Sequence, residues 1–374
     1  MTMQQRFLIN DPPWGPLFRA ALAADVASAR LSRAYRLYYM LRPFIPLVAR
    51  QFLQSRRKVE IDQHWYVQDA FLRRLAEELQ GEANLPPIVH PWPDGAQFGF
   101  VLTHDVETSA GMHNIARVAQ IEERLGLRSS WNIVPYKYRI DEGLLADLRA
   151  RGFEIGIHGY NHDGKLYCSQ RVFRRRAAAI NRALERHQAV GFRSPMVHRH
   201  LNWLQQLNVE YDASCFDIDP FQAMPGGVAS LWPLIVGKFV ELPYTLPQDH
   251  TLFVVLGHTS GAIWRKKLET IVSHNGMALM LTHPDYLQSS RHLDVYRRFL
   301  EDVLEWAGFW HALPRQVAAW WQQREQTTVE RESSGNWGLS GPAAARASVA
   351  RPAFDGERLA LRSLPREIAA TSGA

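Results

Sequence analysis

Short apolar runs alternate with amphipathic stretches along residues 98–323 of this chain. The runs have the length and the β-branched and aromatic content of strands. We expect strands at Phe98–Thr103, Ser129–Val134, Phe153–His158, Val190–Phe192, Val240–Pro243 and Met277–Thr282. Apolar residues at helical spacing predict helices at His113–Leu125, Glu142–Arg151, Ser169–His187, Lys266–His274, Asp294–Ala307 and Pro314–Gln323. Regular alternation of strand and helix predicts an α/β fold with a parallel sheet, either open or closed into a barrel.

The two ends of the chain differ from this central region. Residues 1–90 show a helical pattern, and within them Tyr35–Lys58 mixes aromatic and basic side chains around Pro43 and Pro46, which interrupt any single helix. This segment is either an interfacial segment on an anionic membrane surface or a pair of short helices packed on the main domain. We expect residues 1–90 to be a helical extension, residues 91–325 to be the catalytic domain, and the Ser-, Gly- and Ala-rich residues 326–374 to be a disordered tail.

Composition and charge narrow the function classes. The 374 residues are 46% hydrophobic, which supports a sizeable core, and the net charge of +6 is modest for this length. No nucleic-acid-binding module accompanies the charge, so nucleic acid is not expected as a partner. Two cysteines cannot form a disulfide framework, and no run approaches the roughly 18 apolar residues that span a bilayer. Since the N-terminus also lacks a signal-peptide pattern, we expect a cytoplasmic protein, with peripheral contact to the inner membrane face as an option.

Ionisable side chains follow the expected strands at their carboxyl ends, where parallel α/β folds and barrels place ligands and catalytic groups. Four groups share this position: Asp105 with Glu107, His158 with His162, Arg193, and His283. Imidazole nitrogens and carboxylate oxygens together suit a borderline divalent cation such as zinc. Three protein ligands leave one coordination position open, which is typical of catalytic rather than structural metal sites.

The order of these groups resembles the polysaccharide deacetylases of carbohydrate esterase family 4, the family with the NodB homology domain. That family has an Asp-containing strand end, a His-x-x-x-His motif, an Arg-x-Pro motif and a late Leu-x-His motif. The matching segments are Asp105–Glu107, His158–His162, Arg193–Pro195 and Leu281–His283. The resemblance covers about residues 98–323. It implies a deformed (β/α) barrel of about seven strands, a divalent metal that is usually zinc, and hydrolysis of N-acetyl groups on amino sugars.

The first motif departs from the family pattern. Family members commonly carry adjacent aspartates there, whereas Val106 follows Asp105, and Asp105-Val-Glu107 resembles a variant branch with spaced acids. Positions two apart on a strand share a face, so both carboxylates can address one site. By this resemblance Glu107, His158 and His162 are the metal ligands and Asp105 is the base. The reverse assignment of the two acids is the alternative.

The resemblance also implies roles for the two later groups. Arg193 would pair with Asp105 and keep it ionised and oriented, and His283 would protonate the departing nitrogen. A charged neighbour could keep His283 protonated; Asp285 is one candidate, with a structural role in the turn as its alternative. A further acid-bearing motif of the family would fall in the segment that contains Asp212, Asp217 and Asp219, and the pattern does not choose among these three.

The remaining histidines and one tryptophan carry weaker signals. His104 should point away from Asp105 on the strand and pack in the interior. His198 and His200 follow the Arg-Ser-Pro turn and are expected to be solvated loop residues. Trp232 either lines a sugar subsite or packs in the core.

Three functions agree with this pattern. The first is a metal-dependent hydrolase that removes N-acetyl groups from an amino-sugar polysaccharide or its lipid-linked precursor. The second is hydrolysis of a small amide or a cyclic ureide on the same scaffold. The third is a non-catalytic glycan-binding module with a decayed site, and the presence of both His158 and His162 argues against it. We expect the first function, with an N-acetylated glycan as the substrate.

Overall fold

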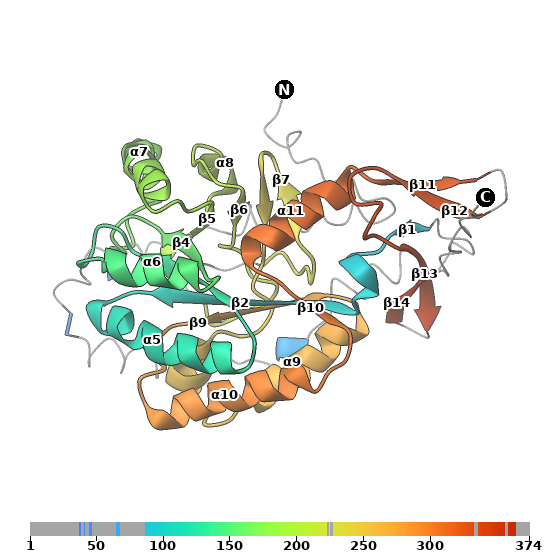
Figure 1. Ribbon diagram of the computed structural model, residues 1–374. Coiled ribbons are helices and arrows are strands. Elements are labelled where there is room, and N and C mark those ends of the chain that lie inside the picture. Colours follow the sequence, from blue (N-terminus) through green and yellow to red (C-terminus); the bar gives the residue numbers. More distant parts are fainter. Residues whose placement is uncertain are drawn as a thin grey trace.

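The computed structural model describes residues 37–38, 41, 45–46, 65–67, 87–222, 224, 227–332, 336–355 and 358–363. The N-terminal extension expected for residues 1–90, with its segment Tyr35–Lys58, lies almost wholly outside the described residues. The central region forms an α/β unit in which one curled sheet carries helices on its outside (Figure 1). Among the helices that the structure describes, none is both long enough and apolar enough to cross a membrane.

Parallel strands form the centre of the molecule and curl into a deformed barrel. In spatial order they are β9 (Met277–Thr282), β2 (Phe98–Val106), β3 (Ser129–Ile133), β4 (Glu154–His158), β5 (Gly191–Arg193), β6 (Tyr211–Asp212) and β8 (Phe239–Glu241). The segment after β8 returns toward the first strand, because Leu246 forms a parallel bridge with Met280 of β9. The expected α/β fold with a deformed barrel of about seven strands is confirmed.

Two short strands extend the sheet. β7 (Leu234–Val236) pairs antiparallel with β8, and β10 (Phe309–His311) pairs parallel with the first residues of β2. All nine residues of β2 are buried, as is usual for a central strand covered on both faces. The strand therefore delivers its last polar residues to the carboxyl edge of the barrel.

Helices cover the outside of the barrel. They are α5 (Ser109–Arg124), α6 (Glu142–Ala150), α7 (Gln170–Arg186), α9 (Ala262–Ser273), α10 (Ser290–Leu304) and α11 (Pro314–Glu325). Four of them begin after a side chain that accepts a backbone N–H of the first turn: Thr108, Asp141, Ser169 and Ser289. Shorter helical segments are α8 (Leu201–Leu204), a π-helix at His250–Val255, and turns at Trp65–Val67, Pro93–Gly95 and Pro195–Val197.

The register of the parallel strands brings polar residues side by side. Asp105 of β2 lies opposite Asn132 of β3, and His158 of β4 lies opposite Arg193 of β5. These four residues come from four neighbouring strands and lie at one edge of the barrel. The register thus assembles residues that are far apart in the chain.

The disordered tail expected for residues 326–374 is wrong for the part that the structure describes. β11 (Thr328–Arg331) and β12 (Trp337–Ser340) pair with each other, and β13 (Val349–Asp355) lies between β1 (Ile88–Val89) and β14 (Arg358–Ser363). The partner β1 is far away in sequence, so the local composition of the tail does not reveal this pairing. Residues 364–374 lie outside the described residues.

Candidate metal centre

Glu107, His158 and His162 converge at the carboxyl edge of the barrel. One ligand atom from each lies within 4.8 Å of the others, and Glu107 Oε1 is 2.8 Å from His162 Nε2 and 3.9 Å from His158 Nε2. In a tetrahedral zinc site with bonds of about 2.0–2.1 Å, neighbouring ligand atoms are about 3.3 Å apart. The two distances from Glu107 lie on either side of that separation. The three residues could therefore hold one divalent metal ion with small side-chain shifts.

The hydrogen bonds of the two imidazoles agree with that use. His158 Nδ1 lies 3.1 Å from the backbone oxygen of Arg193, which can only accept, so Nδ1 carries the proton and Nε2 keeps its lone pair. The Nε2 atoms of His158 and His162 are buried and form no well-directed hydrogen bond with a described residue, although Glu107 Oε1 lies 2.8 Å from His162 Nε2. Burial lowers the pKa of His162 and outweighs the carboxylate of Glu107. Neutral imidazoles with free lone pairs are what a metal ion requires.

The loop that carries His162 has a strained backbone. His162 itself has a φ of 58°, in the left-handed region that non-glycine residues rarely adopt. Gly159 has a φ of 69°, and a Cβ there would lie 2.3 Å from Pro195 Cγ. The glycine is therefore required for the close approach of the two loops.

Asp105 lies beside the three residues in a buried ion pair. Its Oδ1 accepts from Arg193 Nη1 at 3.1 Å and from Asn132 Nδ2 at 2.9 Å, and its Oδ2 lies 3.6 Å from His158 Nδ1. Burial alone would raise the pKa of Asp105, but the neighbouring His158 ring and the Arg193 guanidinium outweigh it and hold that pKa below its ordinary value. Arg193 is held in turn by Thr103 Oγ1 at 2.8 Å. The carboxylate is therefore ionised and fixed in orientation.

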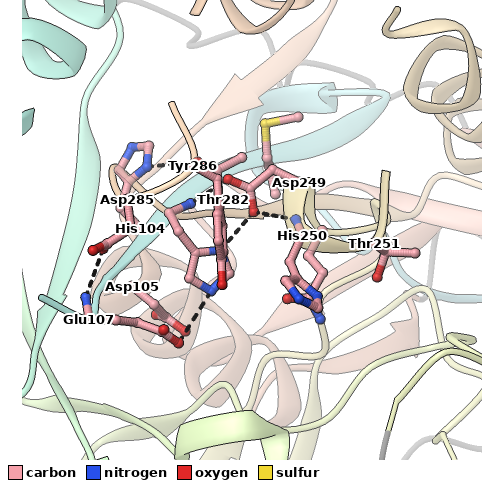
Figure 2. A network of polar contacts seen from close by, with 12 residues as sticks. His104, Asp105, Glu107, Asp249, His250, Thr251, Thr282, Asp285 and Tyr286 are labelled. Carbon is pink, nitrogen blue, oxygen red and sulfur yellow. Dashed lines mark hydrogen bonds and ion pairs between the residues drawn. The ribbon is translucent and has the colours of Figure 1, made fainter. Parts of the chain in front are cut away.

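His283 faces Glu107 from the other side and is held by Asp249. His283 Nε2 lies 3.8 Å from Glu107 Oε1, while Asp249 accepts from both the backbone N and Nδ1 of His283 at 2.7 Å each. Figure 2 shows Asp249 opposite Asp105 and Glu107 in this network. Burial would lower the pKa of His283, but Asp249 raises it to about 10. The ring therefore carries a proton on Nε2 at neutral pH.

The acidic partner of His283 is thus Asp249 and not Asp285, the candidate named from the sequence. Asp285 accepts from Glu107 N at 3.0 Å and from Thr108 Oγ1, so its structural role in the turn is the correct one of the two interpretations (Figure 2). The three aspartates of the segment expected to hold a further acid-bearing motif have other partners: Asp212 accepts from Ser214, Asp217 pairs with Lys267, and Asp219 accepts from Tyr244. Sequence reasoning also missed Asn132, whose signal is an amide in the middle of a buried strand.

Three weaker expectations can be checked. His104 packs inside, with Nε2 2.6 Å from Glu122 Oε1 and Nδ1 2.8 Å from Thr282 Oγ1, as expected. His198 is buried, so the prediction of a solvated residue is wrong for it, whereas His200 is partly exposed and stacks on Trp203. Trp232 packs in the core near the amino end of β9, because its Nε1 donates to Asn275 O at 3.0 Å.

Comparison with solved structures reveals the same fold in two proteins with known structures. A putative polysaccharide deacetylase from Mycobacterium smegmatis has 20% sequence identity and a TM-score of 0.52, over 63% of this chain and 94% of that chain. The Puue allantoinase has 14% identity and a TM-score of 0.52, over 64% and 94% of the two chains. No protein-family model and no curated protein matches the sequence. This protein is therefore similar in fold to polysaccharide deacetylases and to an allantoinase.

Proposed function

We propose that this protein is a metal-dependent hydrolase that removes N-acetyl groups from an amino-sugar polysaccharide or its lipid-linked precursor. The observation that carries the proposal is the convergence of Glu107, His158 and His162 beside two further pairs, Asp105–Arg193 and His283–Asp249. A metal-ligand set, an ionised carboxylate and a protonated imidazole together supply the Lewis acid, the base and the acid for metal-dependent hydrolysis of an amide. The fold, shared with structures described as a deacetylase and an allantoinase, supports the same reaction class.

The described residues account for the proton transfers of the reaction. A metal ion held by Glu107, His158 and His162 would act as a Lewis acid on the amide carbonyl and make the attacking water more acidic. Asp105 accepts the proton of that water, and Arg193 keeps the carboxylate ionised and aimed. His283 Nε2 then donates its proton to the nitrogen as the carbon–nitrogen bond breaks. The products are a free amine on the sugar and acetate.

Metal content tests the proposed ligands directly. Purified protein, stripped with a chelator and reloaded with zinc, should hold about one zinc per chain, because three side chains converge on one point. His158→Ala should lose most of that metal. His200→Ala is the matched control, since His200 stacks on Trp203 and is not one of the three converging residues. Equal zinc in the wild-type protein and His158→Ala would contradict the site.

Acetyl release tests the reaction. Mass spectrometry of N-acetylglucosamine oligomers after incubation with the zinc-loaded protein should show loss of acetyl groups, and Asp105→Asn should abolish that loss. An unchanged oligomer with fully loaded protein would contradict deacetylation of this glycan class.

Hydrolysis of a cyclic ureide is the second candidate, and the structural likeness to the Puue allantoinase favours it. The metal-ligand set and the two flanking pairs suit both the N-acetyl group of an amino sugar and the ring amide of a cyclic ureide. Allantoin supplied under the same conditions separates the two candidates: ring opening without acetyl release from oligomers would replace the first proposal with the second.

A further inference from the structure

Helix α7 is rich in arginine, and most of its arginines form no ion pair with a described residue. The helix contains six arginines and a single acidic residue, Glu185, in its last turn. Arg176 pairs with Asp163 at 2.6 Å, and Arg186 pairs with Glu142 at 3.0 Å. The other four are exposed, and the structure gives them no ion pair with any described residue: Arg171, Arg174, Arg175 and Arg182.

These four side chains share one side of the helix, the arginine face of α7. At about 100° per residue they fall within an arc of about 100°, and Arg171 and Arg182 are about 16 Å apart along the axis. Glu185 falls on the same arc and reduces the excess charge by one. By contrast, Arg297 and Arg298 of α10 pair with Asp294 at 2.6 and 2.8 Å. Helix α7 lies on the outside of the barrel (Figure 1), so its arginine face carries positive charge there that no described residue neutralises through an ion pair.

An exposed tyrosine lies beside this face. Tyr136 is 44% exposed, and its hydroxyl donates to Ala179 O of α7 at 2.9 Å. Its ring also contacts Tyr160, with the centroids 4.8 Å apart, so it is held in place although much of it faces solvent. Tyr160 lies between His158 and His162 in sequence. The arginine face and Tyr136 therefore border the edge of the barrel that carries the candidate metal centre.

We propose that the arginine face of α7, with Tyr136, docks on the surface of an anionic lipid bilayer. Guanidinium groups form paired hydrogen bonds with phosphate, and tyrosine favours the boundary between apolar and aqueous phases. A convex helix face of about 16 Å suits a plane of lipid phosphates better than a single polymer strand, which would run along a groove.

Docking in this way would hold the metal-bearing edge of the barrel near the bilayer. α7 begins directly after the loop that carries His162 and is tied to that loop by the pair between Arg176 and Asp163. With the proposed deacetylase function, on which this one step rests, the preferred substrate would be a lipid-linked glycan. The docking itself does not depend on the reaction.

Vesicle co-sedimentation of the full chain tests the docking. The protein should bind phosphatidylcholine vesicles that contain 30% phosphatidylglycerol, bind pure phosphatidylcholine far less, and lose binding as salt rises. Each surface arginine contributes about fivefold to such a partition coefficient, so Arg171→Gln with Arg175→Gln should lower it about 25-fold. The matched control is Arg124→Gln with Arg291→Gln, two exposed arginines on α5 and α10, which removes the same charge and should change binding less than about twofold.

Three results would overturn the proposal. They are equal loss in the two double variants, equal binding to both vesicle types, and arginine-dependent binding to soluble dextran sulfate without binding to vesicles. His158→Ala separates this test from the proposed function, because it removes a metal ligand and should leave vesicle binding unchanged. Vesicle binding without acetyl release would therefore contradict the deacetylase and leave the docking in place.

Discussion

Asp249 sets both the orientation and the charge of His283. It accepts from the backbone N and from Nδ1 of this histidine, which leaves Nε2 facing Glu107. With the carboxylate in place, the pKa of His283 is about 10, so the ring stays protonated over the whole neutral range. A histidine with this charge can donate a proton but cannot act as a base, which divides the two roles between His283 and Asp105.

Asp249→Asn should shift the pH profile of the reaction. Loss of the negative charge lowers the pKa of His283, so the ring loses its proton at lower pH and activity falls earlier on the alkaline side. We expect kcat at pH 8 to drop about 100-fold, the usual contribution of a positioned proton donor. The pH dependence of kcat for acetyl release measures this. Asp285→Asn is the control, since Asp285 contacts Glu107 N and Thr108 and should leave the alkaline limb in place.

At the level of elements, the side chain of Asn132 on β3 lies so close to Gly156 on β4 that only glycine fits at position 156. A Cβ on Gly156 would lie 2.0 Å from Asn132 Oδ1, and Asn132 Nδ2 is a donor to Asp105. The contact between two strands therefore sets the position of the proposed base. A side chain at position 156 would displace the side-chain amide of Asn132 without contacting any residue of the metal centre.

Gly156→Ala should therefore lower both stability and activity. The added methyl group overpacks the space beside Asn132, and we expect the free energy of unfolding to fall by about 1–3 kcal/mol, with a lower kcat/KM. Urea unfolding and acetyl-release kinetics measure the two effects. In an Asn132→Ala background the same substitution should cost at least about 1 kcal/mol less, because the colliding atom is gone. Equal costs in the two backgrounds would show that the collision is not the cause.

The strands and helices of the barrel could be predicted from the sequence because their signal is local. β9 has the predicted bounds, Met277–Thr282, since all six residues are buried and a glycine precedes them. α10 begins at Ser290 rather than at Asp294, because Ser289 supplies the cap before the apolar pattern begins. The six predicted site residues also follow local apolar runs, so their shared edge could be inferred from strand ends alone.

Asp249 could not be predicted in the same way. It directly precedes a π-helix, His250–Val255, and no strand run ends beside it. Its partner His283 is 34 residues away, and the contact depends on how the segment after β8 crosses to β9. Pairings of this kind are decided by tertiary packing, which leaves no periodic pattern in the sequence.

At the scale of the whole molecule, the segment after residue 326 packs against the start of the barrel domain. Ser348 O accepts from His90 N at 2.8 Å, and Arg324 of α11 donates to Val89 O at 2.8 Å. His90 therefore lies buried where the start of the barrel domain, the last barrel helix and the strands after residue 326 meet. The stability of this junction should depend on the charge of that one histidine.

Burial lowers the pKa of His90 from 6.5 to about 4, and the nearby charge of Arg324 adds to the effect. The unfolded chain therefore binds a proton on this residue at higher pH than the folded chain, so the free energy of unfolding falls as the pH drops from about 6.5 towards 4. Between pH 7 and pH 5 this one group should remove about 2 kcal/mol. In His90→Asn an amide oxygen can still accept from Trp92 N, and the group no longer titrates. Urea unfolding at pH 7 and pH 5 measures how far the free energy of unfolding falls between the two pH values. This fall should be about 2 kcal/mol smaller in His90→Asn than in the wild-type protein. Equal falls in the two proteins would mean that His90 is not the group responsible.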